Sequence, residues 1–220
     1  MSDHDQRQEI VRVGKMLHDK SFIAAGDGNI SVRIDNYTIL STPTCMSKGM
    51  MTAEDLVTVD MNGCKTAGFR EVSSEVAMHL MIYRVRPDVN AIVHAHPPTA
   101  TGFAAAGLAL DAPLVSEVVL TLGAVPLAQY ATPGTSELVD ALEPLVPDHS
   151  AILMANHGVV AYGADLMLAY MHMETVEHFA KIMLVTNQLG RSCPLSDDQV
   201  ARLKEIRRRN EAHRTEQTRA

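Results

Sequence analysis

The sequence predicts an α/β protein built as a three-layer sandwich, in which helices flank a largely antiparallel central sheet. Segments at residues 29–34, 37–41 and 56–59 alternate in polarity or are β-branched, and they follow one another without intervening helices, which is typical of antiparallel strands. Strands and helices do not alternate regularly enough for a doubly wound parallel sheet. With 220 residues and neither a repeat nor a linker, the chain is expected to form one domain over residues 1–220.

The first half of the chain is expected to start with a helix and to continue as consecutive strands. Ile10 and Leu17 belong to one apolar stripe of an amphipathic helix over residues 5–19. A glycine-rich segment then ends this helix. After the third strand, Asn62-Gly63 is a strong signal for a two-residue β-hairpin turn.

A helix is expected to begin at Ser73-Ser74 and to end before Arg86-Pro87, which places Glu75 in its first turn. The other expected elements are, in chain order, a strand at 90–93, a helix at about 98–106, a short strand at 125–128, a helix at about 135–145, a strand at 151–154, a long helix at about 165–188 and a last helix that starts at 194–197.

The composition excludes several classes of protein. The formal net charge of -7 argues against non-specific binding to nucleic acid. No uninterrupted apolar run approaches the roughly 20 residues that a membrane span needs, and the polar N-terminus is unlike a secretory signal peptide. The 3 cysteines are too few, and odd in number, for a disulfide framework. A cytoplasmic protein without nucleic-acid or membrane partners is therefore expected.

Three histidines and one glutamate from three separate places form a candidate metal site. His94 and His96 follow an apolar run, and residues two apart on an extended chain point to the same face, so both side chains are expected to project together. His157 follows another apolar strand and precedes a glycine that allows a tight turn. With Glu75 they offer the nitrogen and oxygen ligands that zinc prefers. The sequence therefore predicts a Zn²⁺ site in which Mn²⁺ or Co²⁺ can substitute.

A second group of residues is suited to bind phosphate. Backbone amides in glycine turns and at a helix start, together with short hydroxyls and a side-chain amide, make a receptor for an anion. The candidates are Gly28, Asn29, Thr44, Cys45, Ser73 and Ser74. The two serines are the strongest, because the amides and the dipole of a helix N-terminus both favour an anion. Taken singly, each of these residues is also an ordinary turn or cap residue.

The motifs S-S-E at 73–75, H-A-H-P at 94–97 and N-H-G at 156–158 together resemble the class II aldolase and adducin-head family over nearly the whole chain. The resemblance implies the sandwich fold and a homotetramer with active sites at the subunit interfaces. It also implies metal-dependent cleavage of a short ketose phosphate to dihydroxyacetone phosphate and an aldehyde, through an enediolate that the metal stabilises. Glu75 would leave the ion and transfer a proton as general acid or base. Cys45 stands where the family usually has glycine.

The resemblance also implies a second proton-transfer group at the oxygen of the aldehyde, and here the sequence departs from the family. The expected tyrosine, contributed by a neighbouring subunit, is missing from the segment 113–119, where the matching position is Glu117. A buried unpaired carboxylate is costly. Glu117, within an otherwise apolar segment, is therefore predicted to be either catalytic or a paired residue of a subunit interface.

Two alternatives to an aldolase remain open. A sugar-phosphate epimerase, a dehydratase or a decarboxylase would use the same fold and ion. The epimerases of the family carry aspartate where this chain has Glu75, which favours the aldolase. An adducin-like scaffold would have no catalysis, but such domains lack the full ligand set that this chain retains.

Overall fold

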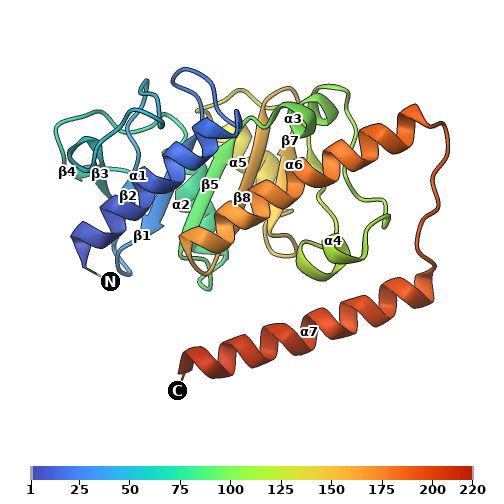
Figure 1. The fold of residues 1–220 in the computed structure, drawn as a ribbon. Helices are drawn as coiled ribbons and strands as arrows, with labels where there is room; N and C mark the ends of the chain where they lie inside the picture. Colours follow the sequence, from blue (N-terminus) through green and yellow to red (C-terminus); the bar gives the residue numbers. More distant parts are fainter. Residues whose placement is uncertain (1, 220) are drawn as a thin grey trace.

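The computed structural model describes the backbone of residues 2–219 and the side chains of residues 2–210. Within this part, eight strands form one sheet in the order β4-β3-β2-β1-β5-β8-β7-β6 (Figure 1). Neighbouring strands are antiparallel except for β6 and β7, which are parallel. The predicted, largely antiparallel sheet is confirmed. The strands are β1 (Asn29–Arg33), β2 (Thr38–Ser41), β3 (Val57–Asp60), β4 (Lys65–Ala67), β5 (Ala91–Ala95), β6 (Leu127–Ala128), β7 (Ala151–Met154) and β8 (Gly158–Gly163).

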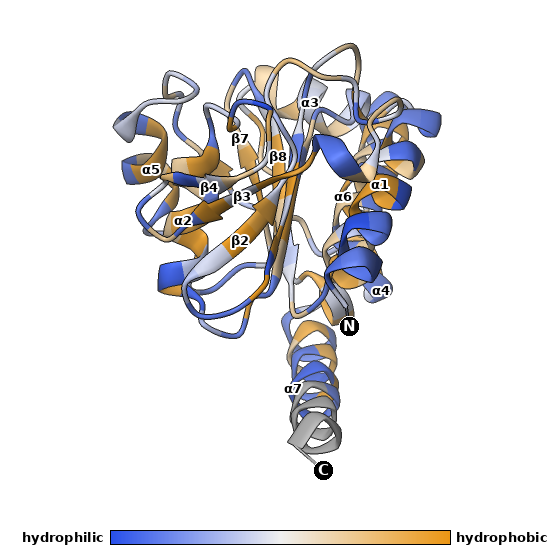
Figure 2. Ribbon diagram, turned by 90° about the vertical axis from the view of Figure 1, so that its left-hand side faces the viewer, coloured by the Kyte–Doolittle hydropathy of each residue, from blue (hydrophilic) through white to orange (hydrophobic). Residues whose placement is uncertain are grey.

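Helices cover both faces of the sheet and produce the predicted three layers (Figure 2). One face lies under α1 (Asp3–Asp19), α3 (Pro98–Ala105) and α6 (Leu166–Gln188), and the other under α2 (Val76–Val85) and α5 (Ser136–Leu142). The remaining helical segments are η1 (Ala53–Asp55), α4 (Ser116–Thr121) and α7 (Asp197–Arg219). Among residues 2–219, no helix combines the length and the apolar character that a membrane span requires.

The alternation of side chains along β5 places the first ligand histidine. Ala91, Val93 and Ala95 belong to the apolar core beneath α1, α3 and α6, whereas Ile92 belongs to the core beneath α2 and α5. His94 shares the face of Ile92, because successive side chains of a strand point to opposite faces. As predicted, Val93 packs away from the metal site. The side chain of His94 is completely buried, at 0% exposure.

Strand β8 lies outside the predicted elements, although it occupies the middle of the sheet between β5 and β7. All residues of β8 are buried, because helices and other segments of the same chain cover both faces of the strand. Such a strand has no alternation of polar and apolar residues for the sequence to reveal. The short edge strand β4 also lies outside the predicted elements, and only the turn before it was expected.

Helix α2 starts later than the predicted Ser73-Ser74, and this difference matters for the site. The helix begins at Val76, and Glu75 is the N-cap residue, so it does not lie in the first turn. The Ser73 hydroxyl accepts a hydrogen bond from the Glu75 backbone N–H over 3.3 Å, which closes a local turn. The Glu75 side chain consequently leaves the chain just before the helix and reaches β5.

Candidate active site

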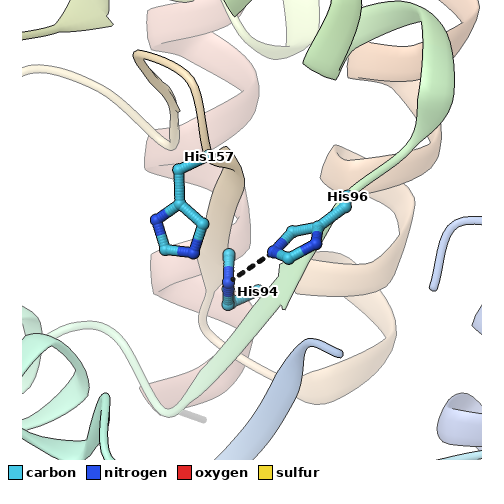
Figure 3. A group of neighbouring side chains, drawn as sticks. All are labelled: His94, His96 and His157. Carbon is cyan, nitrogen blue, oxygen red and sulfur yellow. Dashed lines mark hydrogen bonds between the residues drawn. The ribbon is translucent and has the colours of Figure 1, made fainter. Parts of the chain in front are cut away.

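The three predicted histidine ligands come together at the carboxyl end of β5. His94 lies within β5, His96 lies one residue beyond it, and His157 lies in the turn between β7 and β8 (Figure 3). Their ring centroids are 4.8 to 5.2 Å apart, and one possible ligand atom from each lies within 4.8 Å of the others. The triad is consistent with a site for a divalent metal ion.

The turn that carries His157 depends on residues with unusual backbone freedom. Asn156 adopts a left-handed conformation with φ of 57°, which Asn tolerates better than most residues. A Cβ on Gly158 would meet Cδ2 of His96 at 2.4 Å and the carbonyl oxygen of Ala95 at 2.7 Å. Only glycine therefore lets this turn pack against the end of β5, and the N-H-G motif has a steric explanation.

Hydrogen bonds orient two of the three imidazoles. His94 Nδ1 donates to the carbonyl oxygen of Val159 over 2.9 Å, which leaves Nε2 to face the other ligands. His96 Nδ1 lies 3.5 Å from the carboxylate of Asp27, and its Nε2 lies 3.2 Å from His94 Nε2. Burial, followed by the charge of His94, lowers the pKa of His96 to about 4. Neutral imidazole is the form that binds a metal.

Glu75 supplies the negative charge of the cluster. Its Oε2 lies 3.2 Å from His94 Nε2, and its Oε1 lies 3.2 Å from His157 Nε2. Burial acts to raise the pKa of Glu75, but the two histidines and a hydrogen bond from Asn29 outweigh it and hold that pKa well below its usual range. Burial likewise acts to lower the pKa of His94, and the Glu75 carboxylate outweighs it and raises that pKa.

The charges and ligand types of this cluster show whether it suits a metal ion. The three imidazoles converge, and the buried Glu75 carboxylate, whose Oε1 accepts no hydrogen bond, lies against two of them. Such a set favours a positive charge at its centre, and nitrogen and oxygen donors of these types are those that zinc and similar ions take. The residues therefore fit a divalent cation.

All six phosphate candidates line one pocket of about 220 Å³ beside the histidines. The pocket also contains Glu75, His96 and His157 among its lining residues. A larger hollow of about 460 Å³ lies between α3 and α6, but no ionisable side chain lines it, so it offers no group for this chemistry. The structure thus brings the two predicted constellations into one place.

Within this pocket the phosphate candidates differ in how free they are. The Ser74 side chain is exposed, whereas the Ser73 hydroxyl is engaged by the backbone of Glu75. Asn29 is buried, and its side-chain amide donates to Glu75 Oε2 over 2.8 Å. Gly28 has φ of 66°, and a Cβ there would meet the carbonyl oxygen of His94 at 2.6 Å. Cys45 holds a left-handed backbone with φ of 52°, as a glycine would without strain.

His79 was not among the predicted site residues, and from the sequence Lys48 was interpreted only as an additional charge beside the phosphate candidates. Lys48 lines the pocket and is buried, and its Nζ donates to the carbonyl oxygens of Gly26 and Met46 over 2.7 and 2.8 Å. Burial lowers the pKa of Lys48 to about 8. His79 lies one helical turn beyond Glu75, and this spacing of four residues is the signal that could have indicated it.

Glu117 does not join the other predicted site residues within one chain. Glu117 is exposed on α4, so it is not a buried carboxylate, and it does not line the pocket. In Figure 1, α4 lies near the lower ends of the strands, above α7, while α3, which follows His96, lies near their upper ends. Within one chain Glu117 does not share the pocket with His96 and His157, so a catalytic role would require Glu117 from a second copy.

The sequence profile of the family described as the Class II Aldolase and Adducin N-terminal domain matches residues 8–184. The chain belongs to this family. A 5-deoxy-D-ribulose 1-phosphate aldolase of Bacillus thuringiensis serovar kurstaki is 34% identical over 200 residues, which cover 90% of this chain and 93% of the relative. A 3-oxo-tetronate 4-phosphate decarboxylase of Pectobacterium atrosepticum is 36% identical over 188 residues, which cover 84% and 86% of the two chains.

A solved structure of an L-fuculose 1-phosphate aldolase superposes with a TM-score of 0.86 at 33% identity, covering 93% of this chain and 97% of that chain. The class II aldolase fold predicted from the three motifs is thereby confirmed. Class II aldolase family members with similar sequences divide between aldolases and decarboxylases, so family membership alone does not choose the reaction.

Proposed function

We propose that the protein is a metal-dependent aldolase that cleaves a short ketose phosphate into dihydroxyacetone phosphate and an aldehyde. The observation that carries this proposal is the position of Glu75, whose carboxylate lies against His94 and His157 and at the wall of the pocket that contains Ser74. A proton-transfer group, a metal-ligand set and an anion receptor thus lie side by side. The aldolase relatives support the same reaction.

The histidine triad and Glu75 would hold Zn²⁺, with Mn²⁺ or Co²⁺ as substitutes. A divalent ion held there would act as a Lewis acid on the carbonyl oxygen of the substrate. The protein contributes the orientation of the ligands. Val159 fixes His94 through its carbonyl oxygen, and the Asp27 carboxylate lies beside Nδ1 of His96.

Cleavage of the carbon–carbon bond needs two proton transfers. The hydroxyl that becomes the aldehyde loses its proton, and the electron pair of the broken bond remains on the carbon next to the ketone. That carbon must then accept a proton. We assign this second transfer to Glu75, because its carboxylate lines the pocket and its Oε1, which lies beside His157, accepts no hydrogen bond. Glu117 of a second copy is our candidate for the hydroxyl proton.

The phosphate group of the substrate would bind in the part of the pocket that Ser74 and Thr44 line. Ser74 and Thr44 offer hydroxyls, and the N-terminus of α2 offers backbone amides and its dipole. Lys48 adds a charged donor. Two of its three ammonium hydrogens are directed to carbonyl oxygens, which leaves one for the ligand.

Decarboxylation of a 3-oxo acid phosphate is the second candidate. The Pectobacterium relative supports it, and so does the extra positive charge of Lys48, since such a substrate carries a carboxylate in addition to its phosphate. Loss of carbon dioxide also leaves an electron pair on a carbon next to a ketone. Glu75 would protonate that carbon in the same way, but no hydroxyl proton would have to be removed.

One substrate panel separates these candidates. The metal-loaded protein is incubated with 5-deoxyribulose 1-phosphate, fuculose 1-phosphate and 3-oxo-tetronate 4-phosphate, and triose phosphate, carbon dioxide and epimers are measured separately. The proposal predicts triose phosphate and aldehyde in equal amounts from a ketose 1-phosphate. The dephosphorylated ketoses serve as matched controls and should react far more slowly. Carbon dioxide from the oxo acid without triose release from any ketose phosphate would replace the aldolase by the decarboxylase.

A further inference from the structure

A continuous line of hydrogen bonds connects Tyr83, near the C-terminal end of α2, to Glu75 through residues of β1 and α2. Tyr83 and Ser31 are joined through their hydroxyl oxygens over 2.9 Å, and Ser31 Oγ lies 2.6 Å from His79 Nδ1. His79 Nε2 lies 2.5 Å from Asn29 Oδ1, and Asn29 Nδ2 lies 2.8 Å from Glu75 Oε2. The four residues that lead to Glu75 are all buried, at 0% to 4% exposure.

The chemistry of the groups fixes the direction of these bonds. The Glu75 carboxylate only accepts, so the Asn29 amide nitrogen donates to it, and Asn29 Oδ1 is then left as an acceptor. His79 must therefore carry its proton on Nε2. Burial lowers the pKa of His79 to about 3, so the ring is neutral and its Nδ1 accepts. The Ser31 hydroxyl donates to that nitrogen and is left to accept from Tyr83.

The hydrogen bond from His79 fixes the orientation of the Asn29 side-chain amide. A side-chain amide can turn over and exchange its oxygen and nitrogen, which would place an oxygen against the carboxylate of Glu75. The Nε2–H of His79 disfavours the turned form, because two donors would then face each other and two acceptors would meet at Glu75. In the observed form Oε2 of Glu75 accepts a hydrogen bond from Asn29, while Oε1 accepts none and lies 3.2 Å from His157 Nε2.

We propose that His79 is a positioning residue that acts through Asn29 to hold Oε2 of Glu75 and to leave Oε1 as the oxygen that exchanges a proton with substrate. Ser31 and Tyr83 keep His79 in the Nε2–H tautomer that this role requires. The inference rests on the proposed function for the identity of the proton transfer. The tautomer and the hydrogen-bond directions are properties of the protein alone.

The first test uses the metal-free protein and does not depend on activity. Nitrogen-15 NMR of the histidine side chains distinguishes the two neutral tautomers from the imidazolium. The proposal predicts that His79 is a single neutral Nε2–H tautomer at pH 7, and that Ser31→Ala introduces a measurable fraction of the Nδ1–H form. An Nδ1–H tautomer or an imidazolium in the unmodified protein would overturn the proposal, because Asn29 would then not be held.

The second test measures exchange of the α-proton of dihydroxyacetone phosphate in deuterated water, at saturating metal. His79→Asn removes the donor at the Nε2 position and should lower the turnover number about tenfold or more, with metal content and KM unchanged. His79→Gln, whose amide nitrogen reaches the Nε2 position, should restore much of the rate. Tyr162→Phe is a matched control, because it removes another buried tyrosine hydroxyl that has no link to this line.

A double-mutant cycle separates positioning from a general structural role. If His79 acts through Asn29, then His79→Asn has almost no further effect on exchange in the Asn29→Ala protein. Full additivity of the two substitutions, or an unchanged rate in His79→Asn, would overturn the inference. Absence of exchange in the unmodified, metal-loaded protein would instead contradict the proposed function, and the NMR result would still decide the hydrogen-bond directions.

Discussion

Glu177 Oε2 accepts a hydrogen bond from the backbone N–H of Ala100 over 2.9 Å, and it accepts a second from Thr99 over 3.0 Å. This carboxylate, 1% exposed, thereby joins the middle of α6 to the first turn of α3. Pro97 and Pro98 have no N–H, so these amides are the first donors of the helix. Because His96 directly precedes Pro97, the bond fixes the chain at the point where it leaves the metal site.

We predict that Glu177→Ala lowers the free energy of unfolding by roughly 1.5 to 3 kcal/mol, because it leaves the buried amide of Ala100 and the partly buried amide of Thr99 without a charged acceptor. Glu177→Gln keeps a carbonyl oxygen and should cost less. Urea denaturation measures both. Glu174→Gln on the same helix removes only a partly exposed pair with Lys20, and should change stability by less than about 1 kcal/mol. Equal losses at 174 and 177 would contradict this account of the cap.

The metal prediction concerns the histidine triad. Protein purified without chelator should contain close to one equivalent of a divalent metal, and the double substitution His94→Ala and His96→Ala should abolish binding, because two of the three histidines of the triad are removed. Elemental analysis measures both. His178→Ala changes an exposed histidine of α6 and is the control. Full metal content in the double variant would exclude this site.

Because of the lowered pKa of Lys48, we predict that substrate binding depends on pH. Its pKa of about 8 means that the ammonium is mostly charged at pH 7 and mostly neutral at pH 9. Since the charged form binds the anionic substrate, KM should rise up to about tenfold between these pH values, in proportion to the lost charged fraction. Lys48→Met should have a higher KM that no longer changes over this range.

The thiol of Cys45 lies near Lys48, so this comparison is made in a Cys45→Gly background, where no other side chain of the pocket is altered. A KM that stays constant from pH 7 to pH 9 with Lys48 present would contradict the assignment. So would an equal rise in the Lys48→Met protein.

Cys45 itself is predicted to strain the fold. Its φ of 52° suits glycine, and a non-glycine residue there costs about 1 to 2 kcal/mol. Part of this is offset by the greater entropy of glycine in the unfolded chain, so Cys45→Gly should stabilise the protein by about 0.5 to 1 kcal/mol. Cys64→Gly is the matched control at an exposed cysteine without positive φ, and it should destabilise. Denaturant titrations under reducing conditions compare the two, and a destabilised Cys45→Gly protein would refute the prediction.

The sequence was sufficient for features that depend on local periodicity and on the motifs. His94 and His96 were expected to project together because they are two apart on a strand, and the structure places their rings 4.9 Å apart. The antiparallel sheet and its two helical layers also followed from short-range patterns. The motif around His157 indicated a tight turn, which the conformation of Asn156 confirms.

Features that depend on contacts between distant segments could not be predicted. Ser31 and His79 are 48 residues apart and meet only because α2 packs across β1. The engagement of Asn29 with Glu75, 46 residues away, is equally invisible in the sequence. The role of Glu117 stays a prediction for the same reason, because an apolar sequence neighbourhood shows neither that the residue is buried nor which copy of the chain it contacts, and within one chain it is exposed on α4.

The central claim is that Glu75, beside the histidine triad, transfers a proton to and from the carbon next to the substrate ketone. Deuterium uptake into dihydroxyacetone phosphate, followed by NMR at saturating metal, tests it directly. The unmodified protein should catalyse uptake, Glu75→Gln should lose at least about a hundredfold in rate, and Glu117→Gln should exchange normally, because this half-reaction does not involve the aldehyde. Uptake by a fully metal-loaded Glu75→Gln protein at the unmodified rate would contradict the account.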